Sequence, residues 1–175
     1  GAPDHWRGIC ISHLLNHAAG LQNRFEGNVG QRYFLDYTKE DLIADAKALH
    51  PLAAPGERFE YSDQGYFLLA CILERVTGAS YGEFMQTRFF DPLGMSHTTI
   101  HSKRKLIFDR VAGYTLEHGK LINIRRDSEQ EAQGHFGVMS TIDDMLTWEN
   151  ALHKGSLVPS SQRKRFDSLR QLIAA

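Results

Sequence analysis

The sequence has 175 residues, of which 42% are hydrophobic and 23% charged, and its formal net charge is −1 at pH 7. This composition is ordinary for a globular protein of one domain, and the near-neutral charge gives no reason to expect a nucleic-acid partner. No apolar run approaches the roughly 20 residues that a membrane-spanning helix needs.

Two helices are predicted in the first third of the chain. Ile11 to Gly20 is predicted as a short helix, with Ser12 as its N-cap and Gly20 as its stop. Thr38-Lys39-Glu40-Asp41 is a variant of the capping box and opens a second helix. His50-Pro51 is expected to end that helix, because proline disfavours helical geometry in the residue before it.

The middle of the chain predicts two more helices in succession. Tyr66 to Val76 is a strongly apolar helical segment, and Gly78 stops it. Ser80 then starts another helix, with Glu83 three residues later completing a capping box. Asp91-Pro92-Leu93-Gly94 ends this second segment.

The last third contains the predicted β-structure. Tyr114–Glu117 and the segment 120–124 are expected to form a β-hairpin around His118-Gly119. Thr141 caps a further helix that Gly155 closes, and Pro159-Ser160 opens a final amphipathic helix. The predicted fold class is therefore mainly α with a small β-hairpin.

The segment Gly78-Ala79-Ser80-Tyr81-Gly82 matches G-x-S-x-G, the nucleophile elbow of many serine hydrolases. An elbow needs a strand before its serine, whereas the residues before Gly78 have helical periodicity. The interpretation that fits this context is that Ser80 is an N-cap. An α/β-hydrolase that uses Ser80 stays open as an alternative, and it requires a strand before Gly78.

Three ordered segments resemble the serine β-lactamase-related family, which includes class C β-lactamases, D-Ala-D-Ala carboxypeptidases and β-lactamase-like esterases. They are ISHLLNHAAGL, the long run PGERFEYSDQGYFLLACILERVTGASYGEFMQTRFFDPLGMSHT, and HFGVMSTIDDMLTWENAL. The resemblance covers roughly residues 9–152. It implies the helical-domain portion of a β-lactamase/transpeptidase-like fold and hydrolysis through an acyl-enzyme.

Tyr61-Ser62-Asp63 matches the family's Y-x-N motif, with Asp63 in place of asparagine. By this resemblance Tyr61 exchanges a proton with the serine nucleophile and the leaving group, and Asp63 orients a lysine and a substrate amide. An ionised aspartate accepts hydrogen bonds but donates none, which favours ester over amide substrates. The alternative is that Tyr61 is only an aromatic residue at a helix entry.

The family's S-x-x-K and K-T-G or H-x-G motifs have no convincing counterpart. Ser102–Lys105 and Ser161–Lys164 match S-x-x-K by letter, but both follow Tyr61 and lie in charged stretches. His135-Phe136-Gly137 matches H-x-G but falls in a different family segment. We therefore predict that residues 1–175 form a single partial domain, lacking the nucleophile helix and the C-terminal strands, and that this chain alone turns over no substrate.

Other features suggest no cofactor and no metal. His13 and His17 have the i, i+4 spacing of a helical zinc pair, but an H-E-x-x-H glutamate and a third ligand are missing. Cys10 and Cys71 are expected to be buried thiols, with a disulfide as the open alternative. The expected partner of the parent protein is a small-molecule ester or lactam substrate.

A non-catalytic helical interaction module is the remaining alternative. In either case the isolated chain is expected to expose an apolar face, through which it could self-associate. The substrate class and the compartment are left open by the sequence.

Overall fold

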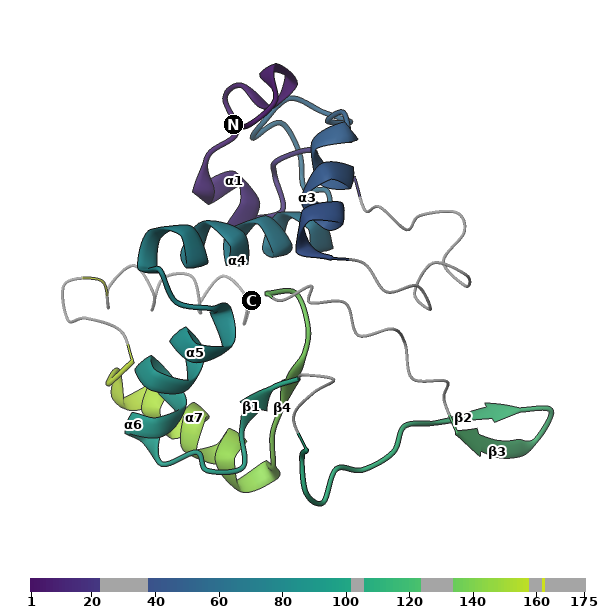
Figure 1. Cartoon of the computed structure of the whole chain (residues 1–175), viewed down its shortest axis with the longest axis vertical. Helices are drawn as coiled ribbons and strands as arrows, with labels where there is room; N and C mark the ends of the chain where they lie inside the picture. Colours follow the sequence, from purple (N-terminus) through teal and green to yellow (C-terminus); the bar gives the residue numbers. More distant parts are fainter. Residues whose placement is uncertain (23–37, 102–105, 124–133, 158–161, 163–175) are drawn as a thin grey trace. The chain divides into compact units, whose positions relative to one another are not determined.

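The computed structural model describes residues 1–22, 38–101, 106–123, 134–157 and 162 (Figure 1). Two compact units are present, one made of Gly1–Tyr81 with His101–Gly137 and the other of Gly82–Ile100 with Val138–Ala175. The helices are η1 (Asp4–Trp6), α1 (Ile11–Leu15), α3 (Lys39–Ala48), α4 (Asp63–Thr77), α5 (Tyr81–Met85), the π-helical turn η2 (Gln86–Phe90), α6 (Asp91–Leu93) and α7 (Ile142–Lys154). The strands are β1 (Thr99–Ile100), β2 (Tyr114–Glu117), β3 (Lys120–Asn123) and β4 (Val138–Met139). The prediction of a mainly helical chain is confirmed.

Helix α4 is the central element of the first unit, and α1 and α3 lie on the same side of it in Figure 1. It begins three residues before the predicted start because Ser62 caps it, accepting a hydrogen bond from the Gly65 N–H at 3.1 Å. It ends as predicted, at Gly78 with a φ of 73°. Its buried face carries Phe67 and Ala70.

Two apolar clusters hold the first unit together. The first contains buried residues of α1 and of the chain after it, and the second joins α3 to α4. Their members are Leu14, Ala19 and Leu21 packed against Trp6, Ile9, Leu68 and Leu69, and Leu42 and Phe67 packed against Ile43, Leu68 and Cys71. Leu68 belongs to both sets of packed neighbours, so α4 links the two clusters.

Helix α1 is shorter than predicted. It ends at Leu15 rather than at Gly20, and its N-cap is Cys10 rather than Ser12, because Cys10 and His13 form the capping box. His17 then turns into a left-handed conformation with a φ of 52°, which stops the helix. The chain after it bonds to a later loop: Gly56 N–H donates to the Ala18 carbonyl at 2.7 Å.

Helix α3 begins as predicted, with Thr38 as its N-cap and Asp41 completing the capping box. The Thr38 N–H donates to Asp41 Oδ2 at 2.9 Å. An ion pair of 2.7 Å between Lys39 Nζ and Glu74 Oε2 ties α3 to α4. Glu74 Oε1 also accepts from the Tyr81 N–H at 2.9 Å, which fixes the turn between α4 and α5.

The second unit begins with the helical run from α5 to α6. Its π-helical turn is followed by α6, whose second residue, Pro92, has no N–H to donate to the carbonyl four residues earlier. The run ends at Gly94, with a φ of 70°, where the sequence predicted its end. Helix α7 has the predicted limits, since Thr141 caps it and Gly155 follows in the left-handed region.

The sheets are small. Strands β2 and β3 form the predicted antiparallel hairpin, with the register Tyr114↔Asn123 and a turn at His118-Gly119 whose φ angles are 50° and 77°. Strands β1 and β4 also pair antiparallel, which the sequence did not predict because two residues per strand give no periodicity. The predicted helix after Pro159 and the residue Ile124 lie outside the described residues.

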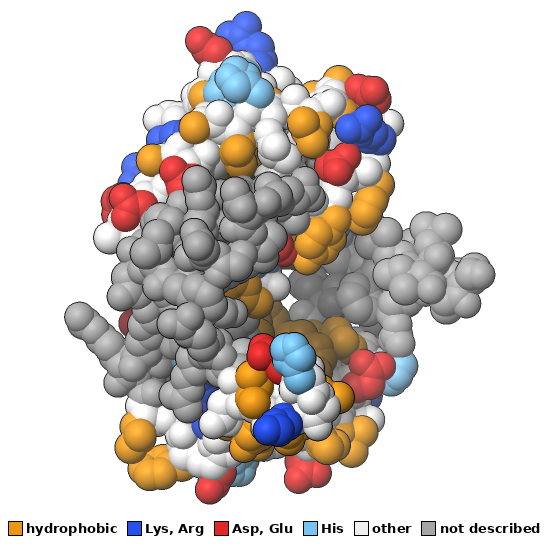
Figure 2. All heavy atoms as spheres, turned by 90° about the vertical axis from the view of Figure 1, so that its right-hand side faces the viewer, with side chains coloured by type: hydrophobic (Ala, Val, Ile, Leu, Met, Phe, Trp, Pro, Cys, Tyr) orange, Lys and Arg blue, Asp and Glu red, His pale blue; other side chains and the backbone are white. Residues whose placement is uncertain are grey.

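Hydrophobic side chains also lie at the surface among charged ones, as Figure 2 shows for one face. Among the described residues, no helix is long and apolar enough to cross a bilayer.

Candidate functional site

The Tyr61-Ser62-Asp63 motif lies at the N-terminus of α4. Ser62 is buried, with 3% of its surface exposed, and acts as the N-cap. Tyr61 on one side of it is 53% exposed, so its phenol is accessible to solvent. Asp63 on the other side is the first residue of the helix. A buried cap therefore lies between the exposed Tyr61 and the half-buried Asp63.

The structure brings the two predicted site residues together. The Tyr61 hydroxyl donates a hydrogen bond to Asp63 Oδ1 at 2.8 Å. This bond and the negative charge of Asp63 raise the pKa of the Tyr61 phenol above its ordinary value, because both favour the protonated form. In this arrangement the phenol stays protonated and its hydroxyl hydrogen is directed at Asp63.

An aromatic cluster surrounds the motif. The His17 ring lies 4.6 Å from the Tyr61 ring and 4.9 Å from the Tyr66 ring, and Phe59 meets it edge-on at 5.5 Å. The Tyr66 hydroxyl donates to the Leu15 carbonyl at 3.1 Å, which attaches the first turn of α4 to the end of α1. Sequence reasoning missed the contact between His17 and Tyr61, and no local signal in the sequence could have revealed it.

The hypothesis of an α/β-hydrolase elbow at Ser80 is wrong. The residues before Gly78 form the 15-residue helix α4 and not a strand. Ser80 directly precedes α5, which is the position of an N-cap. The glycines of GASYG therefore mark a helix end and the start of the next helix.

The other motif matches contribute no nucleophile to this site. Ser102–Lys105 and the serine and lysine of Ser161–Lys164 lie outside the described residues. His135-Phe136-Gly137 directly precedes β4, and the Gly137 carbonyl accepts from the His101 N–H at 2.6 Å. Just before it, Gly134 lies so close to the Tyr66 carbonyl that a Cβ atom would overlap it.

His13 and His17 do not form the helical pair that their spacing suggested. His17 lies beyond the end of α1, and its Nδ1 accepts from the Ser62 N–H at 3.1 Å. His13 Nδ1 accepts from the Cys10 N–H at 3.3 Å. In the part of the chain that the structure describes, no group of three His, Cys, Asp or Glu side chains is placed to hold a metal ion.

The two cysteines are free thiols. Cys10 is exposed, which contradicts the prediction of a buried thiol, because its side chain caps α1 instead of packing inward. Hydrogen bonds with Ser12 and then with the His13 backbone lower the pKa of Cys10. Cys71 is half-buried, and burial raises its pKa to about 11.

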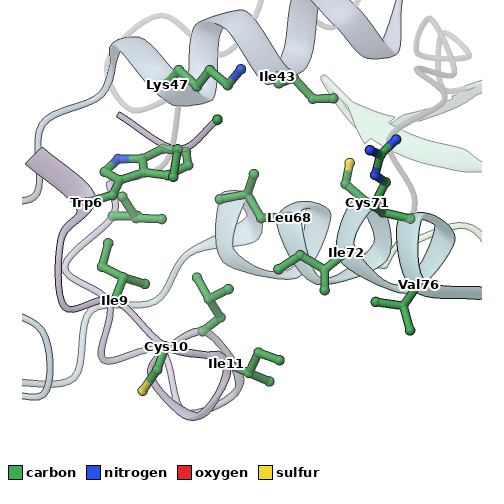
Figure 3. Close-up of a pocket in the computed structure, with 15 residues that line it drawn as sticks. Trp6, Ile9, Cys10, Ile11, Ile43, Lys47, Leu68, Cys71, Ile72 and Val76 are labelled. Carbon is green, nitrogen blue, oxygen red and sulfur yellow. The ribbon is translucent and has the colours of Figure 1, made fainter. Parts of the chain in front are cut away.

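An apolar cavity of about 550 Å³ lies in the first unit, between the N-terminal residues, α1, α3 and α4 (Figure 3). Its lining includes Ile9, Leu14, Leu68 and Ile72, and neither Tyr61 nor Asp63 is part of it. The cavity is therefore separate from the Tyr61–Asp63 pair. In Figure 3 the sulfur of Cys10 points away from the cavity.

Comparison with known proteins identifies related chains. The family model described as Beta-lactamase matches residues 1–172. Penicillin-binding protein 4* of Bacillus subtilis is 26% identical over 91% of this chain and 39% of its own length. A D-aminopeptidase of Gluconobacter oxydans is 26% identical over 87% of this chain and 30% of its own length. The chain thus spans less than half the length of these curated relatives.

Solved structures of similar fold include a D-stereospecific amidohydrolase from Streptomyces sp. It is 26% identical in sequence with a TM-score of 0.76, and the match covers 93% of this chain and 54% of the amidohydrolase chain. An octameric penicillin-binding protein homologue from Pyrococcus abyssi has 30% identity and a TM-score of 0.69 over 82% of this chain and 34% of the other. The family resemblance of the sequence is confirmed. The chain belongs to the β-lactamase family, among relatives named penicillin-binding protein, D-aminopeptidase and β-lactamase.

Proposed function

We propose that this chain supplies the acid–base part of a serine hydrolase that works through an acyl-enzyme on ester, β-lactam or D-amino-acid peptide bonds. The observation that carries this proposal is the accessible Tyr61 phenol held at 2.8 Å by Asp63 at the start of α4. Tyr61 passes a proton to the leaving group and takes one from the nucleophile. Asp63 holds the phenol in position, and residues 1–175 form part of the helical region of one larger domain.

The raised pKa of Tyr61 decides which of these roles the chain can perform alone. A phenol that donates to a carboxylate is protonated at neutral pH and can act as an acid. To act as a base it needs a cation, which would compete with Tyr61 for Asp63 and stabilise the phenolate. We assign that cation and the nucleophilic serine to a Ser-x-x-Lys motif outside this sequence.

The aspartate at position 63 also supports a substrate preference. An ionised carboxylate bonded to Tyr61 has acceptor capacity left but no donor for a substrate carbonyl. Simple ester substrates, which carry no amide carbonyl for an asparagine-type donor to bind, lose least from this arrangement. We therefore place ester hydrolysis ahead of lactam or peptide hydrolysis.

The test is intact mass after incubation with a fluorophosphonate and, separately, with a penicillin. We expect no adduct on this chain, because neither of its S-x-x-K matches precedes Tyr61 as the family's motif order requires, and an adduct on a longer form with Ser-x-x-Lys ahead of residue 1. In that longer form, Tyr61→Phe should lower ester hydrolysis by about 100-fold or more. Full activity of the Tyr61→Phe variant would refute the proposed role of Tyr61.

A second proposal concerns the apolar face around the cavity. Ile11 and Val76 line the cavity and are 53% and 80% exposed, so this chain presents apolar surface to solvent there. We propose that two copies of the isolated chain associate through this face. The octameric relative from Pyrococcus abyssi is an assembly of that protein, and it makes self-association worth testing here.

The measurement is sedimentation velocity over a range of concentrations. We expect concentration-dependent association of the unchanged chain, and its loss in Val76→Glu. Val111→Glu is the matched control, because Val111 is 83% exposed and does not line the cavity. A monomer at every concentration, or equal effects of both variants, would contradict association through this face.

A further inference from the structure

His17 contacts the Tyr61 motif through its ring, its ring nitrogen and its backbone. The ring packs on Tyr61 with centroids 4.6 Å apart and planes tilted by 31°, and on Tyr66 at 4.9 Å and 29°. Its Nδ1 accepts from the Ser62 N–H at 3.1 Å, and its carbonyl accepts from the Glu60 N–H at 2.7 Å. Both residues flanking Tyr61 are thus bonded to the same histidine.

The hydrogen bond to Ser62 fixes the state of the imidazole. A ring nitrogen that accepts from a backbone N–H carries no proton, so the proton of the neutral ring is on Nε2. Ser62 is almost completely buried, and its N–H would otherwise lose its partner away from water. Protonation at Nδ1 would place two donors against each other and break this bond.

The backbone of His17 is in a conformation that the surrounding fold must hold in place. Its φ of 52° lies in the left-handed region, which non-glycine residues seldom adopt, although His and Asn are enriched there. Such positions persist where neighbouring contacts determine them, and they gather at functional sites. Here the conformation aims the ring at Tyr61 instead of continuing α1.

We infer that His17 is the positioning residue of Tyr61: its neutral imidazole fixes the phenol at Asp63. The inference rests on the proposed function of Tyr61 for its consequence in hydrolysis, but not for its geometry. His17 acts through Ser62 and the ring contact and does not itself touch the phenol proton. Loss of the Nδ1 acceptor therefore releases the Ser62 N–H, while the backbone carbonyl of residue 17 still accepts from Glu60, and it lets the Tyr61 hydroxyl leave Asp63.

The ring contacts that hold His17 in place are aromatic. They are the uncharged Phe59 and the two tyrosines. Of the charged residues beside Tyr61 in the sequence, Asp63 is bonded to Tyr61, and Glu60 Oε2 pairs with Arg58 at 3.3 Å. From α1, His13 is engaged with Cys10.

The experiment uses two variants that both tolerate a positive φ. His17→Gly removes the ring and the acceptor, whereas His17→Asn removes the ring but offers Oδ1 where Nδ1 was. In this chain, NMR of selectively labelled tyrosine follows the titration of Tyr61, and ¹⁵N shifts report the tautomer of His17. In the unchanged chain we expect His17 to be the Nε2–H tautomer. In His17→Gly the pKa of Tyr61 should fall towards that of free tyrosine, and in His17→Asn most of the raised pKa should be recovered.

Hydrolysis by the longer form with its nucleophile gives an independent readout. We expect His17→Gly to lower kcat by about 10- to 100-fold with a smaller change in KM, and His17→Asn to recover most of the lost kcat. Equal behaviour of the two variants, or an Nδ1–H tautomer in the unchanged chain, would overturn the inference. If Tyr61→Phe leaves hydrolysis intact, the proposed function fails, while the NMR results still decide the positioning role.

Discussion

Gly20 is a position where one added methyl group should be costly to the site. Its φ is 70°, and a Cβ there would overlap the carbonyl oxygen of Ala53 and lie 3.1 Å from the Ala53 nitrogen. The Gly20 carbonyl also accepts from the Leu52 N–H at 2.8 Å. Gly20→Ala must therefore push apart two backbone segments, and one of these leads directly to His17.

Gly78 is a matched control for this substitution. Its φ is 73°, almost the same as that of Gly20, but a Cβ there meets nothing within 4 Å. Gly78→Ala should lose about 1 kcal/mol from left-handed strain alone. Gly20→Ala adds an overlap worth about 1–3 kcal/mol and a weakened hydrogen bond worth about 1 kcal/mol. We expect a total loss of about 3–5 kcal/mol for Gly20→Ala.

The assay is urea unfolding followed by circular dichroism, with the free energies of unfolding of the two variants compared. Because small domains have roughly 5–15 kcal/mol of stability, the Gly20 variant should be close to unfolding and the Gly78 variant well folded. Losses that agree within about 0.5 kcal/mol would refute the reasoning. That result would mean that the backbone around Ala53 yields easily and does not hold the His17 segment in place.

Three further predictions concern charge and burial. Iodoacetamide at pH 7.5 should modify Cys10 well before Cys71, because hydrogen bonding lowers the pKa of the exposed Cys10 and burial raises the pKa of Cys71 to about 11. Mass spectrometry maps the labelled cysteine, and faster labelling of Cys71 would contradict this prediction. The pKa of Tyr61 is higher in the folded chain than in the unfolded one, so its stabilising effect is complete below about pH 10 and is lost as the pH rises through the folded value. Asp63→Asn should lower that pKa in an NMR titration, and an unchanged titration would show that Asp63 does not act on the phenol. Finally, Asp144→Ala should lower the free energy of unfolding in urea by about 2–4 kcal/mol, because the buried Asp144 Oδ2 accepts from the His97 N–H at 2.9 Å and from Thr98 Oγ1 at 2.7 Å. The exposed Asp143 in the same turn is the control, and an equal loss in Asp143→Ala would disprove the role of these two bonds.

Local signals in the sequence predicted many of the helix ends. Caps and glycine stops act within one turn of helix, so neighbouring residues suffice to identify them. The correctly predicted ones are the capping box at Thr38–Asp41, the cap at Thr141 and the stops at Gly78, Gly94 and Gly155. The prediction failed at α1, where Ser12 was the expected cap. There the end of the helix depends on contacts of residues 17–20 with the loop at 52–60, which a local pattern does not contain.

The candidate site was likewise predictable from the sequence in part only. The family segments in the sequence identified Tyr61 and Asp63 as candidates, whereas the hydrogen bond between them was found only in the structure. The pairing of β1 with β4 was not predicted, because two-residue strands are too short to show alternation. It also placed Cys10 in the interior, because an apolar neighbourhood in the sequence does not reveal that a side chain caps a helix.

The sequence by itself determined a mainly helical chain, its family and the pair Tyr61 and Asp63, because periodicity, caps and motifs are properties of neighbouring residues. Only the tertiary structure decided that His17 leaves its helix and accepts from Ser62, 45 residues further along the chain. That contact depends on a left-handed backbone at His17 and on the close approach of Gly20 to Ala53. Both arise when distant segments pack together, and their energies have no counterpart in any short stretch of the sequence.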